Sequence, residues 1–174
     1  MANPDERSRF EELVLPHIDS AYNLARWLVR SDAQAEDLAQ DAMLRAYRFF
    51  GGFRGGDARA WLLKIVRNTC YSWFESSRST PDAAEFDEQI HSVAEVTPES
   101  LAIAGSDRER LARALEGLPA RLREVLVLRE LEGCSYKEIA EISGIPIGTV
   151  MSSLSRARRR LEQALGAEER KEAP

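Results

Sequence analysis

In the first part of the chain, apolar residues recur every three or four positions, which is the period of an α-helix. The first stripe runs over residues 6–30, and Pro16 divides it because proline fits the start of a helix but not its interior. Ser31 is a suitable N-cap for a second helix to about residue 50, which two glycines end. Asp57 then caps a third helix over residues 58–74.

The same helical pattern resumes after residue 106. Asp107 caps a short helix that Gly117 ends, and Pro119 precedes a helix over residues 120–131. Gly133 stops that helix. No part of the chain shows the alternating pattern of a β-strand, so the sequence predicts an all-α fold.

Residues 135–161 have the spacing of a helix-turn-helix. Ser135 caps a helix over 136–143, Gly144 permits a left-handed turn, and Pro146 opens the last helix. Apolar or small residues stand where two crossing helices need them, at Ile139, Ala140, Ile145 and Val150. The last helix should bury Val150, Leu154, Ala157 and Leu161. It should then expose a polar face made of Thr149, Ser152, Ser153, Arg156, Arg159 and Arg160.

That exposed face favours nucleic acid. Four of the five residues at 156–160 are arginine, and residues 144–161 contain no acid, although the whole chain carries a formal net charge of -5. A helix that is merely solvated would mix both signs. The polar face therefore suits the major groove of DNA. A helical hairpin with a solvated arginine face is the alternative.

Charge is also segregated in the rest of the chain. Residues 1–44 carry nine acidic and four basic residues, whereas residues 45–78 carry two acidic and seven basic ones. Residues 76–106 are rich in Ser, Pro and acids and have few apolar residues, so we expect a flexible linker there. Two compact helical domains on either side of an acidic linker follow from this pattern.

Basic residues of the third helix and of the loop before it are interleaved with aromatic ones. Arg54, Lys64 and Arg67 lie among Phe53, Trp61 and Tyr71. Such a mixture suits single-stranded nucleic acid, in which bases stack on aromatic rings and cations follow the backbone. The alternative is that the rings are core residues, and we expect both to hold in part: Trp61 and Ile65 facing inward, and Lys64, Arg67 and Tyr71 facing out.

Several function classes lack support in the sequence. We find no phosphate-binding loop, no metal-ligand cluster and no nucleophile beside a base, so we expect neither an enzyme nor a cofactor or metal. Cys70 and Cys134 are expected to be reduced thiols. No apolar run is long enough to cross a bilayer, and no signal peptide is evident, so we expect a cytoplasmic protein without membrane insertion.

Two stretches of the sequence resemble the extracytoplasmic-function (ECF) group of bacterial RNA polymerase sigma factors, in the sigma-70 family. Conserved region two of that family is similar to AEDLAQDAMLRAYRFFGGFRGGDARAWLLKIVRNTCYSW. Region four is similar to LPARLREVLVLRELEGCSYKEIAEISGIPIGTVMSSLSRARRRL. The resemblance implies a region-two domain over 1–75, the linker over 76–106, a region-four helix-turn-helix domain over 107–166 and a tail over 167–174.

The resemblance also implies roles for individual residues. Binding to the polymerase core would fall to Asp37, Gln40, Asp41 and Arg45. Recognition of the melted minus-10 element would fall to Phe53, Arg54, Asp57, Lys64, Arg67, Asn68 and Tyr71. Recognition of the duplex minus-35 element would fall to Thr149, Ser152, Ser153, Arg156, Arg159 and Arg160. Many relatives have basic residues where this helix has Met151 and Ser153, so the preferred promoter sequence is left open.

The expected partners are thus the β′ and β subunits of RNA polymerase core and promoter DNA, and an anti-sigma factor is an open possibility. Two other functions are compatible with parts of the sequence. A helix-turn-helix regulator that acts without polymerase would explain the last sixty or so residues but not the amino-terminal half. A helical adaptor for acidic proteins could use both basic faces.

Overall fold

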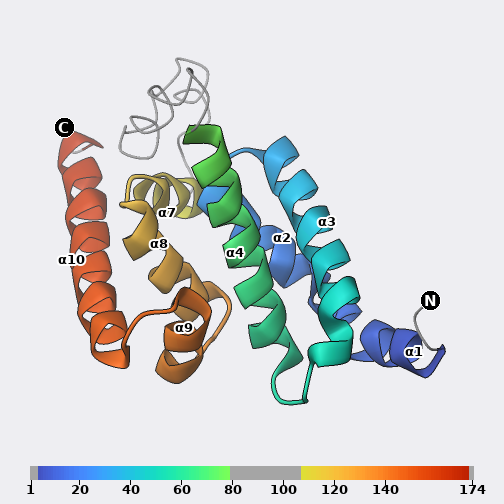
Figure 1. Cartoon of the computed structure of the whole chain (residues 1–174). Helices are drawn as coiled ribbons and strands as arrows, with labels where there is room; N and C mark the ends of the chain where they lie inside the picture. Colours follow the sequence, from blue (N-terminus) through green and yellow to red (C-terminus); the bar gives the residue numbers. More distant parts are fainter. Residues whose placement is uncertain (1–3, 79–106, 173–174) are drawn as a thin grey trace.

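The computed structural model describes residues 4–78 and 107–172, all of whose regular elements are helices. The expected linker over 76–106 lies outside these residues, except for 76–78, which extend the third long helix. The helices form two groups that lie against each other (Figure 1). We refer to them as the amino-terminal and carboxy-terminal modules.

The amino-terminal module contains four α-helices. They are α1 (Pro4–Leu13), α2 (Ile18–Val29), α3 (Asp32–Phe49) and α4 (Ala58–Arg78), with short 3-10 turns at Leu15–His17 and Phe50–Gly52. Helices α2, α3 and α4 pack on one another. Pro16 lies in the turn that separates α1 from α2, as its restricted φ angle predicts.

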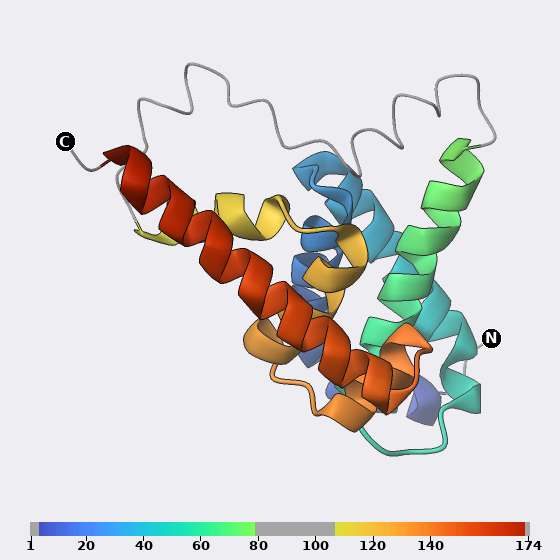
Figure 2. The ribbon, with the colours of Figure 1, turned by 90° about the vertical axis from the view of Figure 1, so that its left-hand side faces the viewer.

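The carboxy-terminal module contains α7 (Asp107–Glu116), α8 (Ala120–Leu126), α9 (Tyr136–Ser143) and α10 (Ile147–Glu172). A π-helical turn over Val127–Leu131 continues α8. Helix α10 packs on α7, α8 and α9, and Figure 2 shows it running along the outside of this module.

Side-chain hydrogen bonds set the start of the helix at two of the predicted caps, Asp57 and Ser135. The side chain of Asp57 accepts a hydrogen bond from the backbone N–H of Ala60 at 3.1 Å, at the start of α4. Ser135 and Glu138 form a reciprocal capping box at the start of α9. Ser31 occupies the N-cap position of α3 as predicted, but its hydroxyl makes no capping hydrogen bond.

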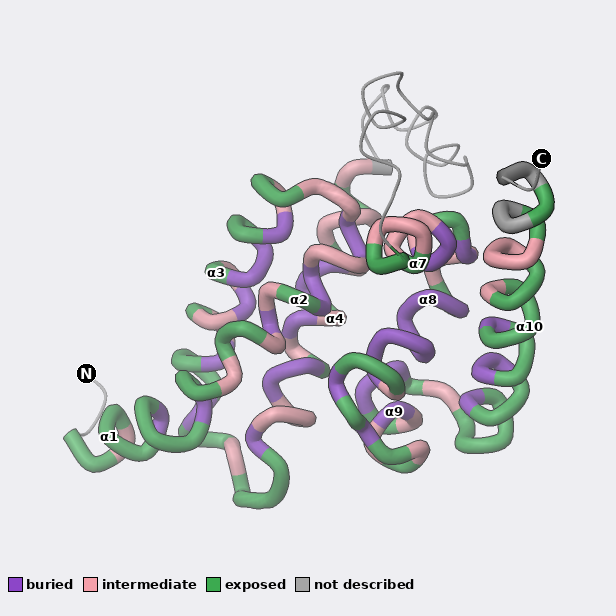
Figure 3. Tube along the Cα trace, turned by 180° about the vertical axis from the view of Figure 1, so that it is seen from behind, coloured by how far each residue is buried: buried purple, intermediate pink, exposed green. Residues whose placement is uncertain are grey.

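Buried apolar residues form one continuous cluster through both modules (Figure 3). In the amino-terminal module its fully buried members include Leu24, Leu62 and Leu63; in the carboxy-terminal module they include Ile139 and Leu154. The modules meet where α4 packs against α9 and α2 packs against α8. Burial of this apolar surface is the main favourable contribution to folding, and here it also holds the modules together.

Candidate nucleic-acid interface

The turn between α9 and α10 has the geometry that a helix-turn-helix requires. Gly144 ends α9 with φ 67° and ψ 33°, a left-handed conformation in which a residue with a Cβ would be strained. The carbonyl of Ala140 accepts hydrogen bonds from the backbone N–H groups of Gly144 and Ile145, at 2.9 and 3.2 Å. These bonds fix the angle at which α10 leaves α9. The predicted helix-turn-helix is therefore present.

Most of the predicted polar face of α10 is exposed, as expected. Val150, Leu154 and Ala157 are buried, and the exposed positions include Thr149, Ser152, Arg156, Arg159 and Arg160. Arg156 is held along the helix, because its Nε donates to the carbonyl of Ser152 at 3.4 Å. The exposed surface of α10 thus presents guanidinium and hydroxyl groups.

The prediction that Ser153 belongs to this exposed face is wrong, because its side chain is buried, with 7% relative exposure. It lies three residues after Val150 and four before Ala157, so helical geometry places it within the apolar stripe of α10. Its hydroxyl oxygen accepts a hydrogen bond from Nη2 of Arg156 at 3.5 Å. Ser153 therefore supports Arg156 and does not face the surface that would meet DNA.

Arg158 also differs from the other arginines of α10. Its Nη2 donates to the Glu130 carboxylate at 2.7 Å, across to the π-helical turn. Both residues border an apolar groove of the carboxy-terminal module, together with Leu111, Leu115, Leu126, Val127, Leu131 and Leu161. Arg158 therefore contributes to packing within the module, whereas Arg159 and Arg160 project into solvent.

The loop before α4 and the beginning of that helix carry the first part of the predicted single-strand site. The ring of Phe53 stacks on Phe50, with centroids 5.7 Å apart, and lies 5.1 Å from the Trp61 ring. Arg54, which follows directly, is exposed. Asp57 caps the helix, as described above, so its carboxylate sets the position of α4 rather than pointing freely outward.

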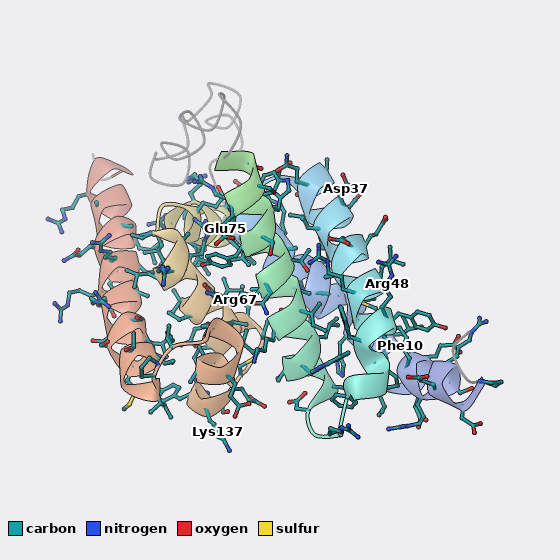
Figure 4. All side chains as sticks on the ribbon, viewed as in Figure 1. Phe10, Asp37, Arg48, Arg67, Glu75 and Lys137 are labelled. Carbon is teal, nitrogen blue, oxygen red and sulfur yellow. The ribbon has the colours of Figure 1, made fainter. Side chains whose placement is uncertain are left out.

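Farther along α4, the predicted site residues separate into two sets. Lys64 and Asn68 are exposed, as expected. Arg67 and Tyr71 were expected to face outward but instead face the carboxy-terminal module, and Figure 4 shows Arg67 on the side of α4 nearest α8. The physical reason is a carboxylate on α8, that of Glu124, which binds both side chains.

Glu124 is almost completely buried, with 2% relative exposure. One of its oxygens accepts hydrogen bonds from Nε of Arg67 at 2.5 Å and from the Ser143 hydroxyl at 2.9 Å. Its other oxygen accepts from the Tyr71 hydroxyl at 2.7 Å. Burial and the neighbouring Glu124 carboxylate raise the pKa of Tyr71 well above its usual value, so Tyr71 remains a hydrogen-bond donor. We call Arg67, Tyr71, Glu124 and Ser143 the interdomain cluster.

Two further contacts join the modules. Nη1 of Arg59, in the first turn of α4, donates to the backbone carbonyl of Glu132. A guanidinium nitrogen of Arg26 on α2 lies 3.9 Å from the Glu116 carboxylate on α7. Polar contacts therefore flank the apolar contact between the modules.

Sequence reasoning missed Glu124 and its neighbour Arg123, which is also buried. Nη1 of Arg123 donates to the backbone carbonyls of Glu116 and Leu118 at 2.9 and 3.1 Å, and burial lowers its pKa to about 10. Two adjacent charged residues in a short amphipathic helix usually face solvent. The only local signal was that both residues stand between two apolar ones, Leu122 and Val125, which are buried. The partner of Glu124, Arg67 on α4, is more than fifty positions away in the sequence.

The outer side of α3 carries the residues predicted to bind polymerase core. Asp37 and Gln40 are exposed, and Figure 4 shows Asp37 on the side of α3 away from α4. Asp41 and Arg45, one helical turn apart, form an ion pair of 2.9 Å on this surface. Exposed Leu44 lies between them in sequence, with 58% relative exposure. The surface thus combines acidic groups with an apolar side chain.

The two cysteines are poorly placed to react as thiolates, and the acidic residues described by the structure are not grouped for metal binding. Cys70 and Cys134 are both free and buried, and burial raises their pKa values to about 12 and about 11, so little thiolate is present at neutral pH. Within residues 4–78 and 107–172, no three His, Cys, Asp or Glu side chains are grouped as a metal site requires. No helix in those same ranges has the length and apolar character needed to span a membrane.

Comparisons with known proteins agree with this geometry. The family model for Sigma-70 region 2 matches residues 13–80, and the model for Sigma-70, region 4 matches residues 108–161. RNA polymerase sigma-H factor of Pseudomonas aeruginosa is 34% identical over 169 residues, which cover 92% of this chain and 88% of that protein. The chain belongs to the RNA polymerase sigma factors.

Further relatives place it within the ECF group of that family. ECF RNA polymerase sigma-E factor of Escherichia coli K12 is 32% identical, and the match covers 90% of this chain and 86% of that protein. The sigma factor RpoE of Bartonella quintana, solved in complex with the anti-sigma factor NepR, is 34% identical with a TM-score of 0.74; the match covers 91% of this chain and 97% of RpoE. CnrH, in complex with the cytosolic domain of CnrY, gives a TM-score of 0.63 at 26% identity, and the match covers 92% of this chain and 90% of CnrH.

Proposed function

We propose that this sigma factor binds RNA polymerase core and directs it to promoters, with α4 reading the minus-10 element and α10 reading the minus-35 element. One observation carries the proposal: a basic, aromatic helix and a helix-turn-helix with an arginine-rich second helix occur together in one chain. A regulator that acts without polymerase would use only the second of these. The chain would therefore act as a transcription initiation factor rather than an enzyme.

Binding to core is assigned to the outer side of α3, on residues Asp37, Gln40, Asp41 and Arg45. Their exposure leaves this surface open in the structure, whereas the opposite side of α3 packs on α2 and α4. Exposed acids beside an exposed Leu44 suit a partner surface that offers basic and apolar side chains. The expected contact is the β′ subunit, with the β subunit contacting other parts of the chain.

Recognition of the minus-10 element is assigned to the end of the loop before α4 and to one side of that helix. Phe53 and Tyr71 offer rings for stacking, and Asn68 offers an amide that can bind a base edge. Arg54, Lys64 and Arg67 supply positive charge for the backbone. Asp57 acts through the helix cap, by holding the loop and α4 in their relative positions. These roles belong to residues 1–75, the proposed region-two domain.

Recognition of the minus-35 element is assigned to residues 107–166, through α10. Thr149, Ser152 and Arg156 lie in its first three turns, the part of a recognition helix that contacts base edges. Arg159 and Arg160 lie farther along and would hold phosphates. Ser153 is withdrawn as a base contact because it is buried, and it is assigned instead to the positioning of Arg156.

Partners other than core and DNA follow from the structural relatives. RpoE of Bartonella quintana was solved in complex with an anti-sigma factor, and its match extends over both modules of this chain. We infer that an anti-sigma factor is a partner of this chain as well. A protein that works with RNA polymerase acts in the cytoplasm, so that is its proposed location.

The proposal is tested by run-off transcription with purified bacterial core polymerase and a library of random promoter sequences. The full chain should select templates that share two short elements at a fixed separation, because two DNA-reading helices belong to one chain. Core polymerase without the chain serves as the control. If the chain selects no sequence with core but binds a palindromic duplex by itself, it is a regulator that acts without polymerase, and the proposal is wrong.

Reversal of charge on α3 should weaken binding to core. Asp37→Lys together with Asp41→Lys places two like charges against the proposed basic partner surface, and such juxtaposition costs several kcal/mol, so we expect roughly a hundredfold loss of affinity. Binding is measured by titrating labelled chain with core. The control is Glu12→Lys with Asp19→Lys, two exposed positions of the same module with the same change of charge. Equal affinities for the two double variants would contradict the assignment.

The arginines of α10 should differ in their effects. Arg159→Ala or Arg160→Ala should weaken binding to all promoters alike. Each should also reduce the salt dependence of binding by about one unit of slope for each phosphate that is no longer bound. Arg156→Ala should instead change the selected minus-35 sequence, by about 1 to 3 kcal/mol if Arg156 binds guanine in a bidentate manner. Promoter selection with variant holoenzymes at two salt concentrations separates these effects. If the selected promoter sequences and the salt slopes are unchanged in all three variants, the arginine face of α10 is only solvated and does not bind DNA.

A further inference from the structure

Helix α10 begins with two exposed apolar side chains to which the proposed function assigns no role. Ile147 and Met151 are four positions apart, so they lie on the same side of the helix, one turn from each other. Their relative exposures are 51% and 54%. A single exposed apolar residue is ordinary on a protein surface. Two of them at the start of a helix that would enter a DNA groove bear on what that helix recognises.

The setting of these two residues separates them from the other exposed apolar side chains of the carboxy-terminal module. Leu111 and Leu131 border the apolar groove described above, whereas Ile147 and Met151 are not among the residues that line it. They share the beginning of α10 with the exposed hydroxyl of Ser152. Figure 2 shows α10 on the outside of the module. The two apolar side chains therefore belong to the face of α10 that is assigned to DNA.

The first turns of α10 offer no side chain that is suited to guanine, adenine or cytosine through its own charge or amide. Residues 147–155 comprise apolar side chains, hydroxyls and one glycine. In the major groove, arginine and lysine read guanine, asparagine and glutamine read adenine, and acids accept from cytosine, whereas the thymine methyl group is read by apolar contact. Because the early part of a recognition helix contacts base edges, thymine is the base that suits this part of α10.

Ser152 adds a hydrogen-bond acceptor beside the apolar pair. Its hydroxyl donates to the backbone carbonyl of Thr149 at 3.2 Å, which leaves the hydroxyl oxygen available to accept. The adenine that pairs with thymine presents an amino donor in the major groove. Met151 and Ser152 are neighbours in sequence and both are exposed. A single T·A pair thus offers a methyl group to the apolar pair and an amino group to Ser152.

We propose that Ile147 and Met151 contact the 5-methyl group of a thymine in the minus-35 element and make this sigma factor select thymine at that position. The inference rests on the proposed function of α10, and it adds which base the first turns of that helix read. Covering one methyl group corresponds to about a fourfold gain in affinity. The contact sets sequence preference, whereas Arg159 and Arg160 would hold phosphates of any sequence.

The test removes the methyl group from the DNA and the apolar side chain from the protein. Holoenzyme with the full chain is titrated with the duplex promoter selected in run-off transcription, in which each minus-35 thymine is replaced in turn by deoxyuridine. For the wild type, at least one replacement should weaken binding about fourfold, because deoxyuridine lacks only the methyl group. In Met151→Ala, Ile147→Ala or both, that replacement should have no further effect. Met151→Leu, which keeps an apolar side chain, should retain the effect.

Arg159→Ala is the matched control, because it should weaken binding through a phosphate and still show the fourfold effect of deoxyuridine. An effect of deoxyuridine on DNA stiffness would persist in every variant. A selected element without thymine, no effect in the wild type, or an effect that both alanine variants retain would overturn the inference and leave the proposed function intact. If the holoenzyme selects no minus-35 element at all, the proposed function of α10 is itself wrong.

Discussion

The two modules pack around the carboxylate of Glu124, which is buried between them. A charged group without water is costly unless hydrogen bonds compensate it, and Glu124 obtains its bonds from Arg67 and Tyr71 in one module and Ser143 in the other. The apolar contact of α4 with α9 and of α2 with α8 removes that carboxylate from solvent. Apolar burial and the charged cluster therefore favour the same arrangement, and separating the modules must disrupt both.

Helix α4 presents three sides in this arrangement. Leu62, Leu63 and Val66 form the core of the amino-terminal module. Lys64 and Asn68 face solvent, and Arg67 faces the carboxy-terminal module. A helix with 3.6 residues per turn can present these three sides over a few turns. The side of α4 that contacts the carboxy-terminal module therefore includes Arg67, one of the residues assigned to DNA.

Much of the fold was predictable because it depends on local chemistry. The caps at Asp57 and Ser135 and the left-handed turn at Gly144 are short-range features, and the structure has each of them at the predicted residue. The contacts of Arg67 were not predictable, because its partner Glu124 is distant in sequence and looks like an ordinary surface acid. Ser153 was misplaced for a different reason: its polar side chain concealed its position in the buried stripe of α10.

The most direct test of this account measures the distance between the modules in the wild-type chain and in Glu124→Lys. Spin labels on Ala33→Cys in α3 and Gln163→Cys in α10 occupy exposed positions outside the proposed sites, while the two native thiols are buried. Pulsed electron paramagnetic resonance should give a short distance for the wild-type chain and a clearly longer one for Glu124→Lys, which loses the carboxylate that binds Arg67 and Tyr71. A distance that Glu124→Lys leaves unchanged would contradict the account.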